Sequence, residues 1–162
     1  MKSDLPQPKT ECAMCNLPGT FEERLAQVRQ WQEEQVARYG FWIDLVIDGG
    51  PAPGLVNIHT HGLKQTFGFP DVQIVINIGQ RNAMGILHHI ASKYRIAATE
   101  NIGQPYVPGV VYADIATMPT CFVEATECDR PVLRLVVPDK NGSLDKDTMD
   151  PLFAKQYTEL VS

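Results

Sequence analysis

Long apolar runs are missing from this sequence, and so is any excess of positive charge. No stretch approaches the roughly eighteen apolar residues that a membrane-spanning helix requires, and no apolar core of a signal peptide follows the first residues. The 14 lysines and arginines are scattered among 19 aspartates and glutamates, for a net charge of -5. We therefore expect a cytoplasmic protein that neither enters a membrane nor binds nucleic acid.

Cysteine is also scarce. The chain has four cysteines, Cys12, Cys15, Cys121 and Cys128, and without an export signal we expect them to stay reduced. Cys12 and Cys15 form a Cys-x-x-Cys pair, but no second pair follows at the spacing that a structural zinc site needs. Two idle thiols are the main interpretation of this pair, and a zinc site and a redox sensor are the alternatives.

The length and the apolar content are those of one globular domain. The chain has 162 residues, of which 44% are apolar. A chain of this size buries roughly 70% of its unfolded surface, so it needs no disulfide or metal to fold. Residues 1–19 are rich in proline and polar residues, and we expect a flexible tail there. Residues 20–162 are expected to form a single α+β domain.

Two segments have the pattern of amphipathic helices. Thr20 and the glutamate three residues later fit a capping box, and Gly40 fits a left-handed C-terminal position. A helix is therefore predicted between them. Apolar residues at helical spacing predict a second helix over 82–95. His88 and His89 lie away from the apolar stripe of this helix, so exposure is the main expectation for them and metal ligation the lesser alternative.

Alternating apolar and polar residues predict β-strands in the rest of the chain. The predicted strands cover 41–47, 55–61 and 72–78, with shorter ones at 110–115, 121–126 and 132–137. Asp44, on the first strand, is expected to face solvent. Because the first three strands follow one another without a long helix, they favour an antiparallel meander. The predicted fold is a mostly antiparallel β-sheet with the two main α-helices packed on it.

His59 and His61 are the strongest candidates for chemistry. They lie two residues apart on a predicted strand, so both side chains project from the same face. Neutral imidazole is a good ligand for zinc, iron, copper and nickel, and the pair therefore indicates a site for a divalent transition metal. The alternative is a pair of solvated or hydrogen-bonded histidines, because a metal site normally needs three or four protein ligands.

The loop after the histidines is the second candidate. Gly62 permits a sharp turn, which we expect to bring Phe67, Phe69 and Asp71 back over the histidines. On this interpretation Asp71 is the acid–base group, and Gly62, Thr66 and the two phenylalanines bind a small-molecule ligand. The equal alternative is a structural loop, whose aromatic side chains fill the core and whose Asp71 caps a backbone N–H group.

Three stretches of the chain resemble one bacterial family. They are Trp31–Trp42, which contains Tyr39-Gly40-Phe41-Trp42; 59–71, which contains His59-Thr60-His61-Gly62-Leu63 and Gly68-Phe69-Pro70-Asp71; and Arg134–Gly142, which contains Pro138-Asp139. The pattern resembles that of the family called domain of unknown function 4262. The resemblance implies that family's fold and a functional region at the middle stretch, but no reaction. The chain departs from the family in having His59 in place of an aromatic residue and Asp71 in place of glutamate.

Together these observations predict a protein that binds metal or a small molecule around His59, His61 and the 62–71 loop. If the protein is an enzyme, a metal-assisted reaction is the most economical interpretation. The alternative is a non-catalytic interaction or regulatory module, whose surface contacts a protein partner or a second copy of the chain as a homo-oligomer. Bound metal favours the first function, and a large apolar contact without a cavity favours the second.

Overall fold

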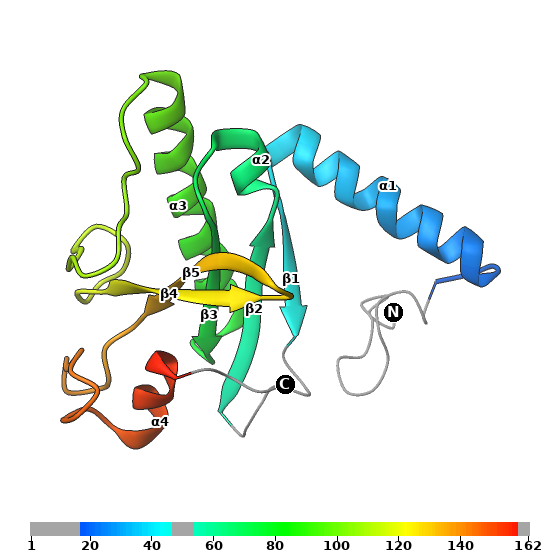
Figure 1. Cartoon of the computed structure of the whole chain (residues 1–162). Helices are drawn as coiled ribbons and strands as arrows, with labels where there is room; N and C mark the ends of the chain where they lie inside the picture. Colours follow the sequence, from blue (N-terminus) through cyan, green and yellow to red (C-terminus); the bar gives the residue numbers. More distant parts are fainter. Residues whose placement is uncertain (1–16, 47–53, 159–162) are drawn as a thin grey trace.

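A computed structural model of the chain describes residues 17–46 and 54–158. Cys12 and Cys15, with most of the predicted tail, lie outside these residues. The described chain has an α+β fold, in which five strands form one sheet in the order β1-β2-β3-β5-β4 (Figure 1). No helix in the described ranges combines the length and the apolar character that crossing a membrane requires.

The sheet is mixed, because one of its strand pairings is parallel. β1 (Trp42–Val46), β2 (Leu55–His61) and β3 (Asp71–Ile76) form the predicted antiparallel meander. β4 (Cys121–Glu127) and β5 (Arg130–Val136) form an antiparallel hairpin, and β5 lies parallel to β3. A parallel pairing needs a long crossover between its strands, and here the crossover contains α3 (Gln80–Thr99).

The strand predicted at 110–115 does not form. This segment contributes a single β-bridge, between Tyr112 and Thr120. Pro108 precedes the segment and Pro119 lies next to the bridge, and proline has no N–H group to donate to a ladder. The segment therefore contributes one bridge and no strand.

Helix α3 covers the apolar face of the sheet. Its stripe of Ala83, Leu87, Ile90 and Tyr94 is fully buried. It belongs to one hydrophobic core with buried residues of β2 to β5, and Ile43 and Leu45 of β1 pack against this core while partly buried. The buried strand residues include Val56, Ile58, Val72, Ile74, Phe122 and Leu135. Each fully buried leucine or isoleucine contributes roughly 1.5–3 kcal/mol to the free energy of folding. The second predicted helix and its buried face are thus confirmed.

Helix α1 (Phe21–Tyr39) forms as predicted and contacts the sheet through its C-terminal half, where the Trp31 ring lies 6.1 Å from the Trp42 ring of β1. The capping box is present, since the Glu23 N–H group donates to Thr20 Oγ1 over 3.2 Å and the Thr20 N–H group donates to Glu23 Oε2 over 3.0 Å. The helix ends at Gly40, whose φ of 88° is left-handed. None of the nineteen residues of α1 is buried, and Figure 1 shows the helix projecting away from the sheet.

The opposite face of the sheet carries a row of polar side chains. The strand register places Asp44 opposite His59, His59 opposite Gln73, and Gln73 opposite Arg134, and side chains of directly paired residues share a face. The C-terminal segment, with α4 (Pro151–Ala154) and the 3-10 helix η2 (Lys155–Tyr157), covers one end of this row. There Arg134 Nη1 donates to the Gln156 carbonyl oxygen over 3.0 Å.

The β4–β5 hairpin covers the other end of the polar row. β4 and β5 lie side by side (Figure 1), and two contacts fix the turn of their hairpin against β2. Arg130 Nη2 donates to the Thr60 carbonyl oxygen over 2.7 Å, and Asn57 Nδ2 donates to Glu127 Oε2 over 2.9 Å. Residues that are about seventy positions apart in the sequence therefore meet above the histidines.

Candidate metal centre

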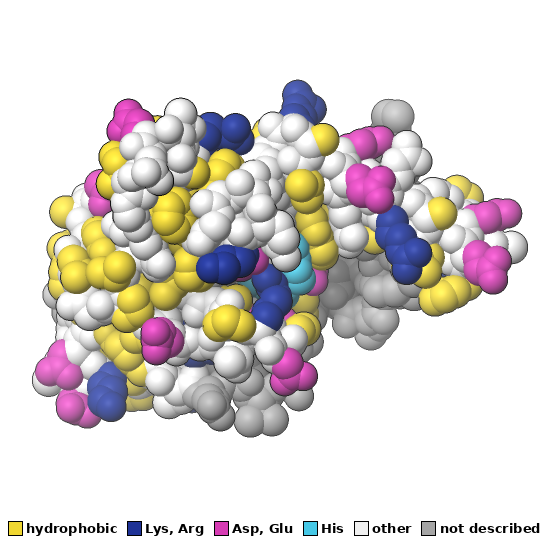
Figure 2. Space-filling model, turned by 45° about the horizontal axis from the view of Figure 1, so that its top comes forward, with side chains coloured by type: hydrophobic (Ala, Val, Ile, Leu, Met, Phe, Trp, Pro, Cys, Tyr) yellow, Lys and Arg dark blue, Asp and Glu magenta, His cyan; other side chains and the backbone are white. Residues whose placement is uncertain are grey.

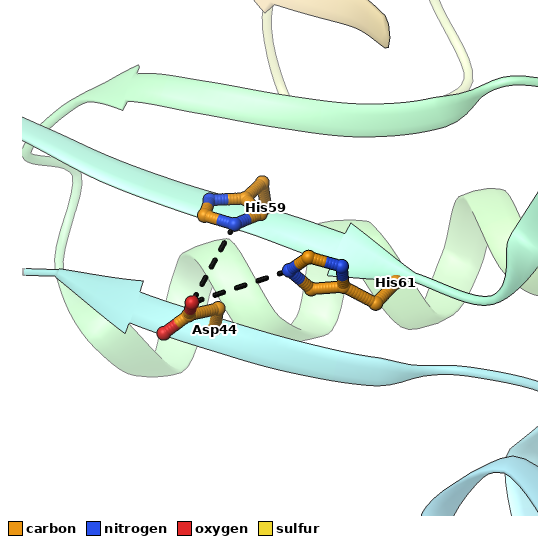
Figure 3. Close-up of side chains that lie close together, drawn as sticks. All are labelled: Asp44, His59 and His61. Atoms are coloured by element: carbon orange, nitrogen blue, oxygen red, sulfur yellow. Dashed lines mark ion pairs between the residues drawn. The ribbon is translucent and has the colours of Figure 1, made fainter. Parts of the chain in front are cut away.

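Three potential metal ligands converge on the polar face of β1 and β2. Asp44 Oδ2 lies 3.6 Å from His59 Nε2 and 4.0 Å from His61 Nε2 (Figure 3). One ligand atom from each of the three residues lies within 4.8 Å of the others. The predicted shared face of His59 and His61 is confirmed, since their ring centroids are 4.8 Å apart. Figure 2 shows a histidine side chain in a hollow of the surface, beside basic and acidic side chains.

His59 is held in one orientation by a hydrogen bond from its inner ring nitrogen. Its side chain is 2% exposed, and Nδ1 lies 3.0 Å from Asn57 Oδ1. The Asn57 amide must present its oxygen there, because its nitrogen donates to Glu127 Oε2. Nδ1 of His59 therefore carries the hydrogen. In the neutral ring this leaves a lone pair on Nε2, the atom that faces Asp44.

Both histidines are in the form that binds metal. Burial lowers the pKa of His61 to about 4, and the positive charge of Arg130 adds to the effect. Burial also lowers the pKa of His59, against the opposing influence of Glu127 and Asp44. Both rings are therefore neutral at pH 7, and a neutral imidazole offers its lone pair to a cation. In the described part of the chain, the buried Nε2 atom of His61 has no hydrogen-bond partner.

The structure does not bring Asp71, the predicted acid–base group, into this cluster. Its carboxylate is 2% exposed and accepts three hydrogen bonds. Oδ1 accepts from Thr60 Oγ1 over 2.8 Å and from the Leu63 N–H group over 3.0 Å, and Oδ2 accepts from Arg130 over 2.8 Å. The Leu63 bond is the backbone cap that a structural role would supply. The acid–base role of Asp71 stays a prediction.

The loop after the histidines lies on the other side of the sheet from the one expected. Residues Leu63–Phe67 form the short helix α2, which contacts α3. The Phe69 ring lies 5.1 Å from the ring of Tyr94 on α3. The expectation that Phe67 and Phe69 return over the histidines was therefore wrong. Their rings pack against the apolar core under α3, where they are removed from water.

Gly62 and Thr66 join this loop to the end of α1. Gly62 has a φ of 109°, and a Cβ atom there would lie 3.1 Å from the Gly40 carbonyl oxygen. Thr66 Oγ1 donates to that same oxygen over 2.6 Å. These contacts explain why a glycine stands at 62. The ligand-binding role of Gly62, Thr66 and the two phenylalanines stays a prediction.

His88 and His89 lie on α3, away from the metal cluster. The His88 ring packs against Phe41 and Tyr39 at centroid distances of 5.0 and 5.2 Å. His89 Nε2 lies 3.5 Å from Asp114 Oδ2, with half-exposed side chains on both residues. His88 is exposed, as expected, and neither histidine belongs to the Asp44 cluster.

Sequence reasoning missed Asp44 and Glu127. Asp44 is 43% exposed, in line with its expected solvent contact, yet one oxygen faces the histidines. Glu127 is 12% exposed, and its Oε1 atom lies 3.6 Å from His59 Nε2. The alternation of β1 could have placed Asp44 on the polar face, but only the register of β1 with β2 pairs it with His59.

Comparison of the chain with family models, with curated proteins and with solved structures gave no match. The resemblance to the family of unknown function therefore stays a prediction from the three sequence motifs.

Proposed function

We propose that the protein binds a divalent transition metal ion through Asp44, His59 and His61. The observation that carries this proposal is the orientation of His59. Its Nδ1–H group is bonded to Asn57, so the lone pair of Nε2 faces a carboxylate oxygen 3.6 Å away. A neutral imidazole lone pair and a carboxylate oxygen repel each other when they face each other, and a cation between them turns the repulsion into two bonds.

The separations between the three ligand atoms suit one ion. With bonds of about 2.1 Å, the ligand atoms of a tetrahedral zinc site lie about 3.4 Å apart. The two distances from Asp44 Oδ2 are 3.6 and 4.0 Å, and all three ligand atoms lie within 4.8 Å of one another, so side-chain shifts of up to about 1 Å bring the atoms to the spacing of an ion's ligands. Two imidazoles and one carboxylate are ligands that Zn²⁺, Fe²⁺, Co²⁺ and Ni²⁺ accept.

The chain also supplies the surroundings that metal ligands need. Asn57 fixes the tautomer and the ring plane of His59, and Trp42 stacks on His61 with ring centroids 4.2 Å apart. If the protein is an enzyme, the bound metal would act as a Lewis acid or lower the pKa of a water molecule. The protein's own part is to hold two neutral imidazoles and a carboxylate in place.

Metal titration of protein made without a histidine tag tests this proposal. We expect the wild-type protein to bind one equivalent of Zn²⁺ in calorimetry, and Asp44→Asn and His61→Ala to weaken binding at least tenfold. His89→Ala and Asp114→Asn are matched controls, because they remove a histidine and a carboxylate that meet outside the cluster. Wild-type protein that takes up no metal, or cluster variants that bind as well as the controls, would overturn the proposal.

A second candidate is a non-catalytic interaction module, and α1 favours it. Phe21, Trp31 and Val36 on this projecting helix are 66%, 45% and 37% exposed, and exposed apolar side chains on one element are typical of contact surfaces. Light scattering during size-exclusion chromatography tests for a homo-oligomer. A dimer that Phe21→Ser and Val36→Ser together dissociate would support this candidate, and a monomer at all concentrations would contradict it.

A further inference from the structure

We infer that Glu127 is a fourth protein ligand of the metal centre, so that the bound ion ties the turn of the β4–β5 hairpin to β1 and β2. This inference rests on the proposed function, because it takes a metal ion at Asp44, His59 and His61 as given. It adds a ligand that comes from a different part of the chain and a role for the ion in holding the fold.

The geometry around His59 is nearly symmetrical. Nε2 of His59 lies 3.6 Å from Asp44 Oδ2 and also 3.6 Å from Glu127 Oε1. Both separations are close to the distance of about 3.4 Å between neighbouring ligands of a four-coordinate ion. Glu127 is not part of the group of three mutually close ligands, so its carboxylate joins an ion on Nε2 of His59 by turning Oε1 toward Asp44 and His61.

The Glu127 carboxylate is held with one oxygen turned toward the site. Its Oε2 atom accepts hydrogen bonds from Asn57 Nδ2 over 2.9 Å and from Gln73 Nε2 over 3.2 Å. Oε1 accepts only a weak bond from the Cys128 thiol over 3.3 Å among the contacts of the described residues. Asn57 thus positions two ligands at once, since the same amide also holds His59.

The charges balance when a divalent cation is present. Glu127 is 12% exposed, and its carboxylate accepts hydrogen bonds from Asn57 and Cys128. Asp44 and Glu127 then bring two negative charges to two neutral imidazoles. The guanidinium of Arg130, the nearest basic group on the hairpin, is already bonded to Asp71 over 2.8 Å. A divalent ion offsets both negative charges, which matters most for Glu127 because its carboxylate is largely removed from water.

The consequence is a cross-link between the two edges of the sheet. β1 and β4 are the edge strands, and in this arrangement one ion binds Asp44 on β1, both histidines on β2 and the last residue of β4. A tetrahedral ion with four protein ligands has no open position, which is the pattern of structural zinc sites. The ion then holds the hairpin turn over the polar face instead of activating water.

Cobalt is the probe that tests the fourth ligand. Tetrahedral Co²⁺ absorbs visible light much more strongly than five- or six-coordinate Co²⁺. We expect wild-type protein to give the strong spectrum. Glu127→Gln keeps the shape of the side chain and an oxygen for Asn57 and Gln73, but it removes the charged ligand. We expect this variant to bind Co²⁺ roughly 10–100-fold more weakly and to give the weak spectrum.

Two further variants separate ligation from charge and from misfolding. Glu127→Asp keeps the charge and shortens the side chain by one methylene, so it should also lose affinity and the strong spectrum. Asp129→Asn removes a charge from the exposed turn of the same hairpin and should behave as wild type. Thermal unfolding of the metal-free variants identifies any that do not fold. If one Glu127 variant fails to fold, the affinity and spectrum of the other Glu127 variant decide the test.

The outcomes distinguish this inference from the proposed function. If wild-type protein binds no Co²⁺, the metal site itself fails. If wild type binds and Asp44→Asn does not, while both Glu127 variants keep the wild-type affinity and spectrum, the site stands and its fourth ligand is not Glu127. Loss of the strong spectrum in the Glu127 variants, with Asp129→Asn unchanged, supports the inference.

Discussion

The indole ring of Trp42 lies flat against the imidazole of His61, with ring centroids 4.2 Å apart and an interplanar angle of 11°. Trp42 and Asp44 project from the same face of β1, opposite His61 and His59. The stacked indole fixes the plane of one ligand, and the proposed metal site therefore has an aromatic wall formed by its own edge strand.

This stacking makes fluorescence a direct measure of metal binding. We expect Cu²⁺ or Co²⁺ to quench most of the tryptophan emission at one equivalent, because such ions quench an indole in contact with their ligand. The chain has two tryptophans, and Trp31 is the second, at 6.1 Å from the Trp42 ring. Emission should respond less in Trp42→Phe than in Trp31→Phe. Equal quenching in free tryptophan solution would contradict a specific site.

The depressed pKa of His61 predicts that metal-free protein loses stability in mild acid. In the unfolded chain the histidine titrates near 6.5, whereas in the folded protein its pKa is about 4. Between these values the unfolded state binds a proton that the folded state does not, so the free energy of unfolding falls as the pH falls. The full difference between these two pKa values corresponds to a loss of roughly 3 kcal/mol in the free energy of unfolding.

Urea unfolding of chelator-treated protein at pH 7 and at pH 4.5 measures this effect. Other groups also titrate in this range, so the comparison is with His61→Asn, whose stability should fall less between the two pH values. The same fall in both proteins would show that His61 is not the group responsible.

Asp71 gives a prediction that separates a structural from a catalytic role. Its carboxylate is buried and joins Thr60 and Leu63 on one side to Arg130 on the other. We expect Asp71→Asn to lower the free energy of unfolding by about 2–4 kcal/mol, because it leaves the Arg130 charge without its partner. Metal affinity should fall less than in Asp44→Asn, because the unpaired Arg130 charge acts on the ligands only through space. A variant with normal stability but altered metal affinity would place Asp71 in the functional site.

Local patterns in the sequence were enough to predict several elements closely. Helix α1 begins after the capping box at Thr20 and ends at Gly40. Strand β2 and its two faces follow from the alternation of Val56, Ile58 and Thr60 with the histidines. These features depend on residues within a few positions of one another. The same locality explains why the direction of α1 away from the sheet was not foreseen, since its capping signals say nothing about packing.

The rest of the site depends on contacts that no local pattern contains. His59 and His61 were found because they share one strand, whereas Asp44 reaches them only through the pairing of β1 with β2. Glu127 comes from a hairpin whose parallel pairing with β3 follows a crossover through α3. A register and a crossover are set by the packing of the whole core, so these two carboxylates could not be predicted from the sequence.

Asn57 offers a test of the polar network that does not alter any proposed ligand. Its oxygen fixes His59 Nδ1 and its nitrogen fixes Glu127 Oε2, at 3.0 and 2.9 Å. We expect Asn57→Ala to weaken Co²⁺ binding by roughly 10–100-fold, the usual cost of removing a group that orients metal ligands. The three or four ligands themselves remain, so one equivalent should still bind at high Co²⁺ concentration.

The matched control is Asn82→Ala on α3, where an exposed asparagine amide donates to the Ile78 carbonyl oxygen over 2.9 Å, away from the site. Competition with a metal-sensitive dye gives the Co²⁺ affinity of both variants, and thermal unfolding shows whether each remains folded. Because Asn57 touches His59 and Glu127 but not Asp44, a double change of Asn57→Ala and Glu127→Gln should cost less than the sum of the two single changes. Additive losses in this cycle would mean that Asn57 does not act through Glu127, and His59 would then be the ligand that it positions.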